Sequence, residues 1–133
     1  MRVPRPGQPV RGSKSGAPIM ALFDLLGRSW SMGVLWTLAE QGPCTFRALQ
    51  EKCESISPAV LNARLQELRA SCLIGHGPEG YFAMPRGEEL YDLLVPMGSW
   101  AKGWARDMIA DVKPIAASPV KRKRAVPGLR PRP

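Results

Sequence analysis

Apolar residues along the middle of the chain recur every three or four positions, the spacing that places them on one face of a helix. This periodicity predicts four helices, at residues 18–26, from about 29 to 41, at 46–53, and from 58 to about 71. Gly27 and Gly42 can end the first two helices, while Thr45 and Ser57 can cap the next two. Each predicted boundary therefore has its own start or stop residue.

A different pattern follows the fourth helix. Two short β-like runs lie at 72–74 and 81–84, and the turn-rich stretch GHGPEG between them is typical of a hairpin loop. A last helical region covers roughly 86–111, and Pro96 inside it predicts a kink or a break. The order of helix, helix, helix-turn-helix, hairpin and long helix predicts a mainly α fold with a small β-hairpin, a winged helix-turn-helix.

Charge divides the chain into three parts. The net charge of +8 comes entirely from the ends, because residues 1–16 carry +4, residues 112–133 carry +7 and residues 17–111 carry −3. Both ends are also rich in proline and glycine and lack periodicity. We expect a disordered basic arm at 1–16, a winged helix-turn-helix domain at 17–111 and a disordered basic tail at 112–133. The two ends either neutralise phosphates or only aid solubility.

Several function classes are disfavoured by what the sequence contains. No apolar run reaches the roughly 18 residues of a membrane span, and no apolar segment follows the basic N-terminus, so a cytoplasmic protein is expected. His76 is the one histidine, and it falls in a predicted turn without a neighbouring nucleophile. There is also no glycine-rich phosphate loop. We therefore expect neither an enzyme nor a bound cofactor.

Three cysteines occur, Cys44, Cys53 and Cys72, and without a Cys-x-x-Cys pair they are read as free thiols with no metal site. Cys53 fits the inner face of its predicted helix. Cys44, in a loop near Arg47, is the candidate for a reactive thiol.

Five segments together resemble the HxlR-type winged-helix transcriptional regulators of bacteria, over about residues 17–105. They are LLGRSW at 25–30, TFRALQ at 45–50, SISPAVLNARLQELRASCLI at 55–74, YFAMPRGEEL at 81–90 and VPMGSWAKGW at 95–104. The most specific is the pattern I-S-P-x-x-L-x-x-R-L-x-E-L, here Ile56 to Leu68. The resemblance implies a dimeric DNA-binding regulator, in which the helix from Pro58 enters the major groove.

The chain departs from the family pattern at several positions. Ala17 stands where members often have a cysteine that some use for thiol sensing, and Ala59 stands where lysine is common. Arg28-Ser29 replaces a frequent glycine-lysine pair, and the wing is short. Most of these changes remove positive charge from the surface expected to face DNA.

The outer face of the predicted recognition helix supplies the candidates for base contact. They are Ser57, Ala59, Asn62, Ala63 and Gln66. Asn62 and Gln66 can pair bidentately with adenine, and Ser57 can reach a phosphate. The alternative is that Asn62 and Gln66 are simply solvated.

Basic side chains near that helix are candidates for contacts with the DNA backbone. They are Arg28, Arg47, Lys52 and Arg64. For Arg64 the alternative is a structural ion pair with Glu67 or Glu54.

Apolar residues of the first and last helical regions form the dimer interface that the resemblance implies. They are Ile19, Leu22, Phe23, Met97, Trp100, Trp104 and Met108. The alternative for the tryptophan and methionine stripe is a pocket for a small-molecule effector between protomers.

The combined prediction is a sequence-specific DNA-binding transcriptional regulator that acts as a homodimer. Its expected partners are double-stranded DNA, a second copy of the chain and an unknown small-molecule effector, with no membrane. The alternative is a winged-helix protein-interaction module, or a non-specific nucleic-acid binder whose affinity comes from its basic ends.

Overall fold

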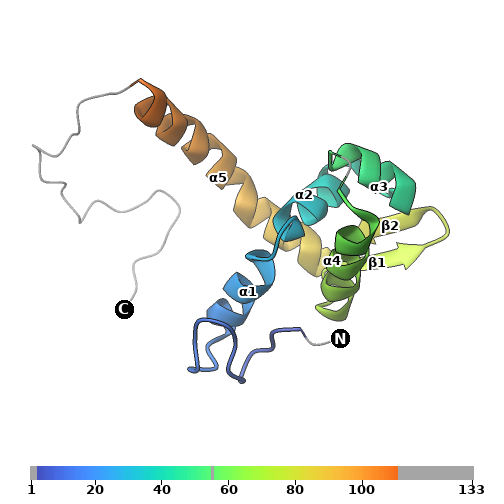
Figure 1. Ribbon diagram of the computed structural model, residues 1–133, viewed down its shortest axis with the longest axis horizontal. Coiled ribbons are helices and arrows are strands. Elements are labelled where there is room, and N and C mark those ends of the chain that lie inside the picture. The colour runs from blue at the N-terminus through green and yellow to red at the C-terminus, as the bar shows by residue number, and fades with distance from the viewer. Residues whose placement is uncertain (1–2, 55, 111–133) are drawn as a thin grey trace, which may run out of the picture. The chain divides into compact units, whose positions relative to one another are not determined.

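The computed structural model describes residues 3–54 and 56–110 of the 133-residue chain. This part folds into helices and one antiparallel hairpin (Figure 1). The elements are α1 (Pro18–Leu26), α2 (Ser31–Gln41), α3 (Phe46–Lys52), α4 (Pro58–Ala70), β1 (Ile74–Gly77), β2 (Gly80–Ala83) and α5 (Pro85–Ile109). The predicted fold class, mainly α with a β-hairpin in winged helix-turn-helix order, is confirmed.

Contacts between residues divide the chain into two units, residues 1–97 and residues 98–133. The first unit holds α1 to α4, the hairpin and the first half of α5. None of the helices within the described residues is long and apolar enough to cross a membrane.

Side-chain caps start the two helices of the helix-turn-helix. The Thr45 Oγ1 atom accepts the Ala48 N–H at 3.1 Å, and the Ser57 Oγ atom accepts the Val60 N–H at 3.2 Å. Pro58 occupies the first turn of α4, where a missing N–H costs nothing. Both predicted caps are therefore present, and they fix where α3 and α4 begin.

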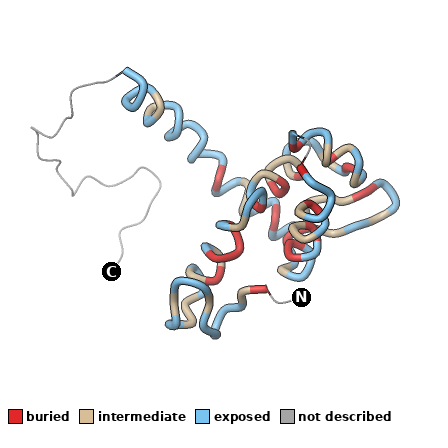
Figure 2. The backbone as a smooth tube through the Cα atoms, in the orientation of Figure 1, coloured by how far each residue is buried: buried red, intermediate tan, exposed pale blue. Residues whose placement is uncertain are grey.

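A single core lies between α2, α3, α4 and the hairpin, and its buried residues gather where these elements meet (Figure 2). On α4, Leu61, Leu65 and Leu68 are each at most 1% exposed, as their spacing predicts. Burying one leucine side chain contributes about 1.5–3 kcal/mol to stability. This leucine stripe attaches α4 to the core and leaves its opposite face exposed.

The strands of the wing differ from the prediction. β1 includes Gly75, His76 and Gly77, which were expected in the loop, and only Pro78 and Glu79 connect the strands. A contact outside the hairpin also holds β2.

Tyr81 of β2 exchanges two backbone hydrogen bonds with Cys44, at 2.9 and 2.8 Å. This bridge fixes β2, and the Tyr81 ring stacks on His76 with ring centres 4.0 Å apart. Since Cys44 lies far from the wing in sequence, local turn signals could not predict this bridge.

Two helix boundaries also differ. α5 is continuous through Pro96, so of the predicted kink or break the break is wrong and the kink stays a prediction. Pro96 and Asp92 are exposed, and water can therefore solvate the carbonyl that proline leaves without a donor. α2 begins at Ser31 because Trp30 has a left-handed φ of 66°. Trp30 is 38% exposed and lies outside the core.

The N-terminal segment has a defined course where a disordered arm was expected. The Gly7 N–H donates to the Gly16 carbonyl at 2.8 Å, Val10 pairs with Ser13, and Val3 is buried. Hydrogen bonds within the segment and the burial of Val3 thus offset the cost of ordering it. The predicted tail at 112–133 lies outside the described residues.

We expect Gly80→Ala to lower the free energy of unfolding by about 2–3 kcal/mol. Gly80 has a φ of +114°, and an added Cβ would collide with the Cys44 carbonyl that fixes the wing. Gly42→Ala is the matched control, because Gly42 also has a positive φ of +84° but faces open space. Urea denaturation measures both, and an equal loss in the two variants would contradict the importance of this close approach.

Candidate nucleic-acid interface

The outer face of α4 comprises Ser57, Ala59, Asn62, Ala63 and Gln66. All are exposed except Ala63, which is half-buried. Asn62 and Gln66 lie one helical turn apart, opposite the leucine stripe. Within the described residues neither amide makes a side-chain hydrogen bond, so both present donors and acceptors to solvent. The sequence prediction therefore identified an exposed polar face on a firmly attached helix.

Ser57 already has a structural role, since its Oγ caps α4. A hydroxyl that accepts one hydrogen bond still has its own O–H to donate. Ser57 can therefore cap α4 and donate to a phosphate at the start of the helix.

Arg28 and Arg64 are not placed as the sequence led us to expect. The Arg28 Nη1 atom donates to Glu67 Oε2 at 2.9 Å, and the Arg64 Nη1 atom donates to Glu67 Oε1 at 2.6 Å. Arg64 Nε also donates to the Ser29 carbonyl at 2.8 Å. The Glu67 side chain is 8% exposed, and burying its charge requires these partners. The alternative pairing of Arg64 with Glu67 is therefore observed, while the assignment of Arg28 and Arg64 to the DNA backbone stays a prediction.

The ion pairs continue from Arg28 to the N-terminal segment. Asp24 Oδ1 lies 3.7 Å from Arg28 Nη2 and 3.3 Å from Arg11 Nη2, while Asp24 Oδ2 accepts the Arg11 backbone N–H at 3.1 Å. The Asp24 Oδ1 atom therefore lies near the guanidinium groups of Arg11 and Arg28 but accepts no hydrogen bond from the described residues.

We call these five residues, Arg11, Asp24, Arg28, Arg64 and Glu67, the Glu67 cluster. It connects the N-terminal segment, α1, the α1–α2 loop and α4. Two pairs of the cluster have helical spacing in the sequence: Arg64 with Glu67 was recognised as an alternative, whereas Asp24 with Arg28 was missed.

Arg47 and Lys52 fit their predicted role better. Both are exposed on α3, and neither lies within 4.0 Å of a carboxylate among residues 3–54 and 56–110. Their charges are therefore available to phosphates.

The cysteines also require a correction. Cys44 is 4% exposed and its Sγ donates to the Gly42 carbonyl at 3.5 Å, so it lacks the access that a reactive thiol needs. Burial raises the pKa of the Cys53 thiol above its usual value, although a hydrogen bond with Thr37 acts in the opposite direction. Cys53 is therefore a protonated core residue. Cys72 is the exposed cysteine.

Most residues assigned to the dimer interface are exposed. On α1, Ile19 and Phe23 are half or more exposed, whereas Leu22 is half-buried. On α5 the exposed residues are Met97, Trp100, Trp104 and Met108. The Trp100 and Trp104 rings stack with their centres 5.9 Å apart. Large apolar side chains that remain exposed on a folded chain mark interaction surfaces.

Comparisons with known proteins agree with this architecture. The model of the HxlR-like helix-turn-helix family matches residues 25–108. The chain is 27% identical to the quinone-bound YodB from B. subtilis, with a TM-score of 0.59 over 64% of this chain and 96% of that one. The reduced form of the transcriptional regulator YodB is 24% identical by alignment and gives a TM-score of 0.54, over 71% of this chain and 95% of that one. This second likeness supports the fold.

Removing the Glu67 carboxylate should cost about 3 kcal/mol of unfolding free energy, because Glu67→Ala leaves two partly buried guanidinium groups without their partner. Glu89→Ala is the matched control. Its ion pair with Arg86 is exposed on both sides, so we expect a loss below about 1 kcal/mol. Chemical denaturation compares the two variants, and a Glu67→Ala loss as small as the control would contradict the structural role of the cluster.

Proposed function

The chain belongs to the HxlR-like helix-turn-helix family of DNA-binding transcriptional regulators, and from that premise we propose that it binds a specific DNA sequence as a homodimer. The observation that carries the proposal is the outer face of α4. Its unpaired amides lie on a helix whose other side is held by the leucine stripe and the Glu67 cluster. A rigid helix with free polar groups is what reading base edges requires.

In the proposed complex, α4 lies in the major groove, with Asn62 and Gln66 reading base edges. Ser57 donates to a phosphate near the start of α4, and Arg47 and Lys52 on α3 contact the backbone. Ala59 and Ala63 offer apolar contact, for example with a thymine methyl group. Because Arg28 and Arg64 are paired with Glu67, we expect them to contribute less to phosphate contacts than Arg47 and Lys52.

The homodimer part of the proposal is supported by the exposed apolar residues of α1 and α5. Winged-helix regulators that dimerise bind two half-sites about one helical turn apart, so a pseudo-palindromic operator is expected. Exposed tryptophans are typical of residues that contribute most at such interfaces.

One observation favours the alternative function, a protein-interaction module or a non-specific nucleic-acid binder. Ala59 stands where lysine is common in the family, and residues 17–111 carry −3. In that case affinity for DNA would come mainly from the basic ends. It would then be the same for all sequences and fall steeply with salt.

Asn62→Ala should weaken binding to the preferred duplex by about 1–3 kcal/mol and leave binding to a scrambled duplex unchanged, because base contacts carry the sequence preference. Gln41→Ala is the control, since Gln41 is an exposed amide at the end of α2. Fluorescence anisotropy with fragments flanking the gene measures all three proteins across a salt series. Equal losses on both duplexes would support the non-specific alternative.

Trp104→Ala should weaken self-association by at least about tenfold, because it removes a large apolar side chain from the proposed interface. Lys102→Ala, on the same helix, is expected to leave the association constant unchanged. Sedimentation equilibrium gives both values. A wild-type protein that remains monomeric at all concentrations would refute the homodimer.

A further inference from the structure

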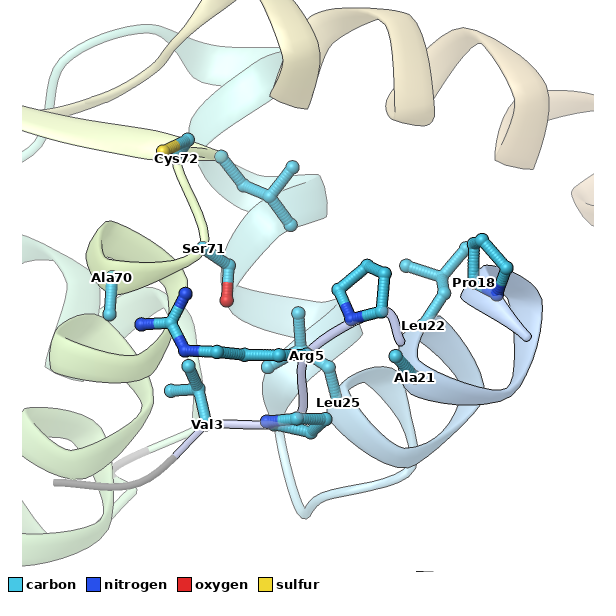
Figure 3. A pocket seen from close by; sticks show the side chains of 12 residues that line it. Val3, Arg5, Pro18, Ala21, Leu22, Leu25, Ala70, Ser71 and Cys72 are labelled. Atoms are coloured by element: carbon cyan, nitrogen blue, oxygen red, sulfur yellow. The ribbon is translucent and has the colours of Figure 1, made fainter. Parts of the chain in front are cut away.

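A small apolar pocket lies between the N-terminal segment, α1 and the end of α4 (Figure 3). Its volume is about 270 Å³, and its walls are mainly proline, leucine, alanine and valine side chains. Engineered apolar cavities of roughly 150 Å³ bind benzene. The pocket therefore has room for one substituted ring.

Arg5 gives this pocket its charge. Among the residues that line the pocket, Arg5 alone has a charged side chain, and Figure 3 shows that side chain extending toward Ala70. Within residues 3–54 and 56–110, no carboxylate lies within 4.0 Å of Arg5, unlike Arg11 and Arg28. A guanidinium group without an ion-pair partner, beside apolar walls, matches a carboxylate attached to a ring.

We propose that this pocket binds a small aromatic or alicyclic carboxylate, with its ring against the apolar walls and its carboxylate paired with Arg5. A cationic ligand is disfavoured by charge. A neutral ligand of the same shape gains the apolar contacts but not the ion pair. Ligand pockets commonly combine apolar walls with a few placed polar groups in this way.

The position of the pocket connects it to the recognition helix. Ala70 is the last residue of α4 and Ser71 is its C-cap, and both line the pocket together with Leu22 of α1. A ligand that contacts the end of α4 and binds more tightly to one position of this helix changes the affinity of the protein for DNA. Bound DNA then changes the affinity for the ligand by the same factor. The inference goes beyond the proposed function, since binding itself requires no DNA.

Calorimetric titration of the full chain with benzoate and with benzamide, without DNA, tests the proposal. Wild-type protein should bind benzoate at least about tenfold more tightly, because only benzoate forms the charged pair. Arg5→Gln should remove this preference, and Arg5→Lys should restore part of it. Arg86→Gln, which changes an exposed arginine outside the pocket, should leave the preference intact.

Two further measurements locate the ligand. Ala70→Phe, at an exposed position that lines the pocket, should abolish binding of both compounds by filling the space. Saturating benzoate should slow the alkylation of Cys72 by iodoacetamide, because this exposed thiol lines the pocket whereas Cys44 and Cys53 are buried.

Three outcomes would overturn the proposal: equal affinity of wild-type protein for benzoate and benzamide, equal effects of Arg5→Gln and Arg86→Gln, or unchanged alkylation of Cys72. Each is measured without DNA. A failure here is therefore distinguishable from a failure of the regulator proposal, which depends on duplex binding.

Discussion

The buried carboxylate of Glu67 is the constraint on which the position of the recognition helix depends. A charge at this depth is tolerated only if hydrogen-bonded cations offset the loss of water, and Arg28 and Arg64 supply them at 2.9 and 2.6 Å. The leucine stripe holds α4 against the core, but apolar contacts have no fixed direction. The Arg28–Glu67 ion pair and the hydrogen bond from Arg64 Nε to the Ser29 carbonyl are directional, and by joining α4 to the α1–α2 loop they add a preferred rotation and register.

This arrangement has a consequence for DNA binding. Two arginines close to the recognition helix, Arg28 and Arg64, pair with Glu67 inside the protein. The outer face of α4 is left with amides and alanines, and the exposed cations of the helix-turn-helix are Arg47 and Lys52 on α3 and Arg69 in the last turn of α4. Recognition by this chain would therefore rest on a few hydrogen bonds from a firmly oriented helix, more than on a dense positive surface.

The parts of the fold that local signals determine could be predicted from the sequence. The starts of α3 and α4 follow from their caps, and the buried face of α4 follows from its leucine spacing. The backbone bridge between Cys44 and Tyr81 could not be predicted, because the two residues lie far apart in the sequence. The same bridge lies beside the thiol that was expected to be reactive and helps to bury it.

The roles of charged side chains were harder to predict than the positions of helices and strands. Arg28 was predicted to contact phosphate because its partner Glu67 lies 39 positions away in the sequence and was not recognised. Only the packing of α4 brings the two residues together. The N-terminal segment was misjudged for a similar reason. Its proline and glycine content is typical of disorder, yet its turn is closed by Gly7 and Gly16, and Asp24 accepts a backbone hydrogen bond from it.

The two ends of α4 therefore have different neighbours. α4 has 13 residues and is about 20 Å long, with Asn62 near the end proposed to face DNA and Ala70 at the end that lines the apolar pocket. Glu67 lies between them, one turn before Ala70. A ligand that displaced the C-terminal end of α4 would act on a stiff helix. The nearest directional contacts that restrain this helix are those of the Glu67 carboxylate. The Glu67 cluster is thus the element through which occupancy of the pocket would alter the orientation of the base-reading residues.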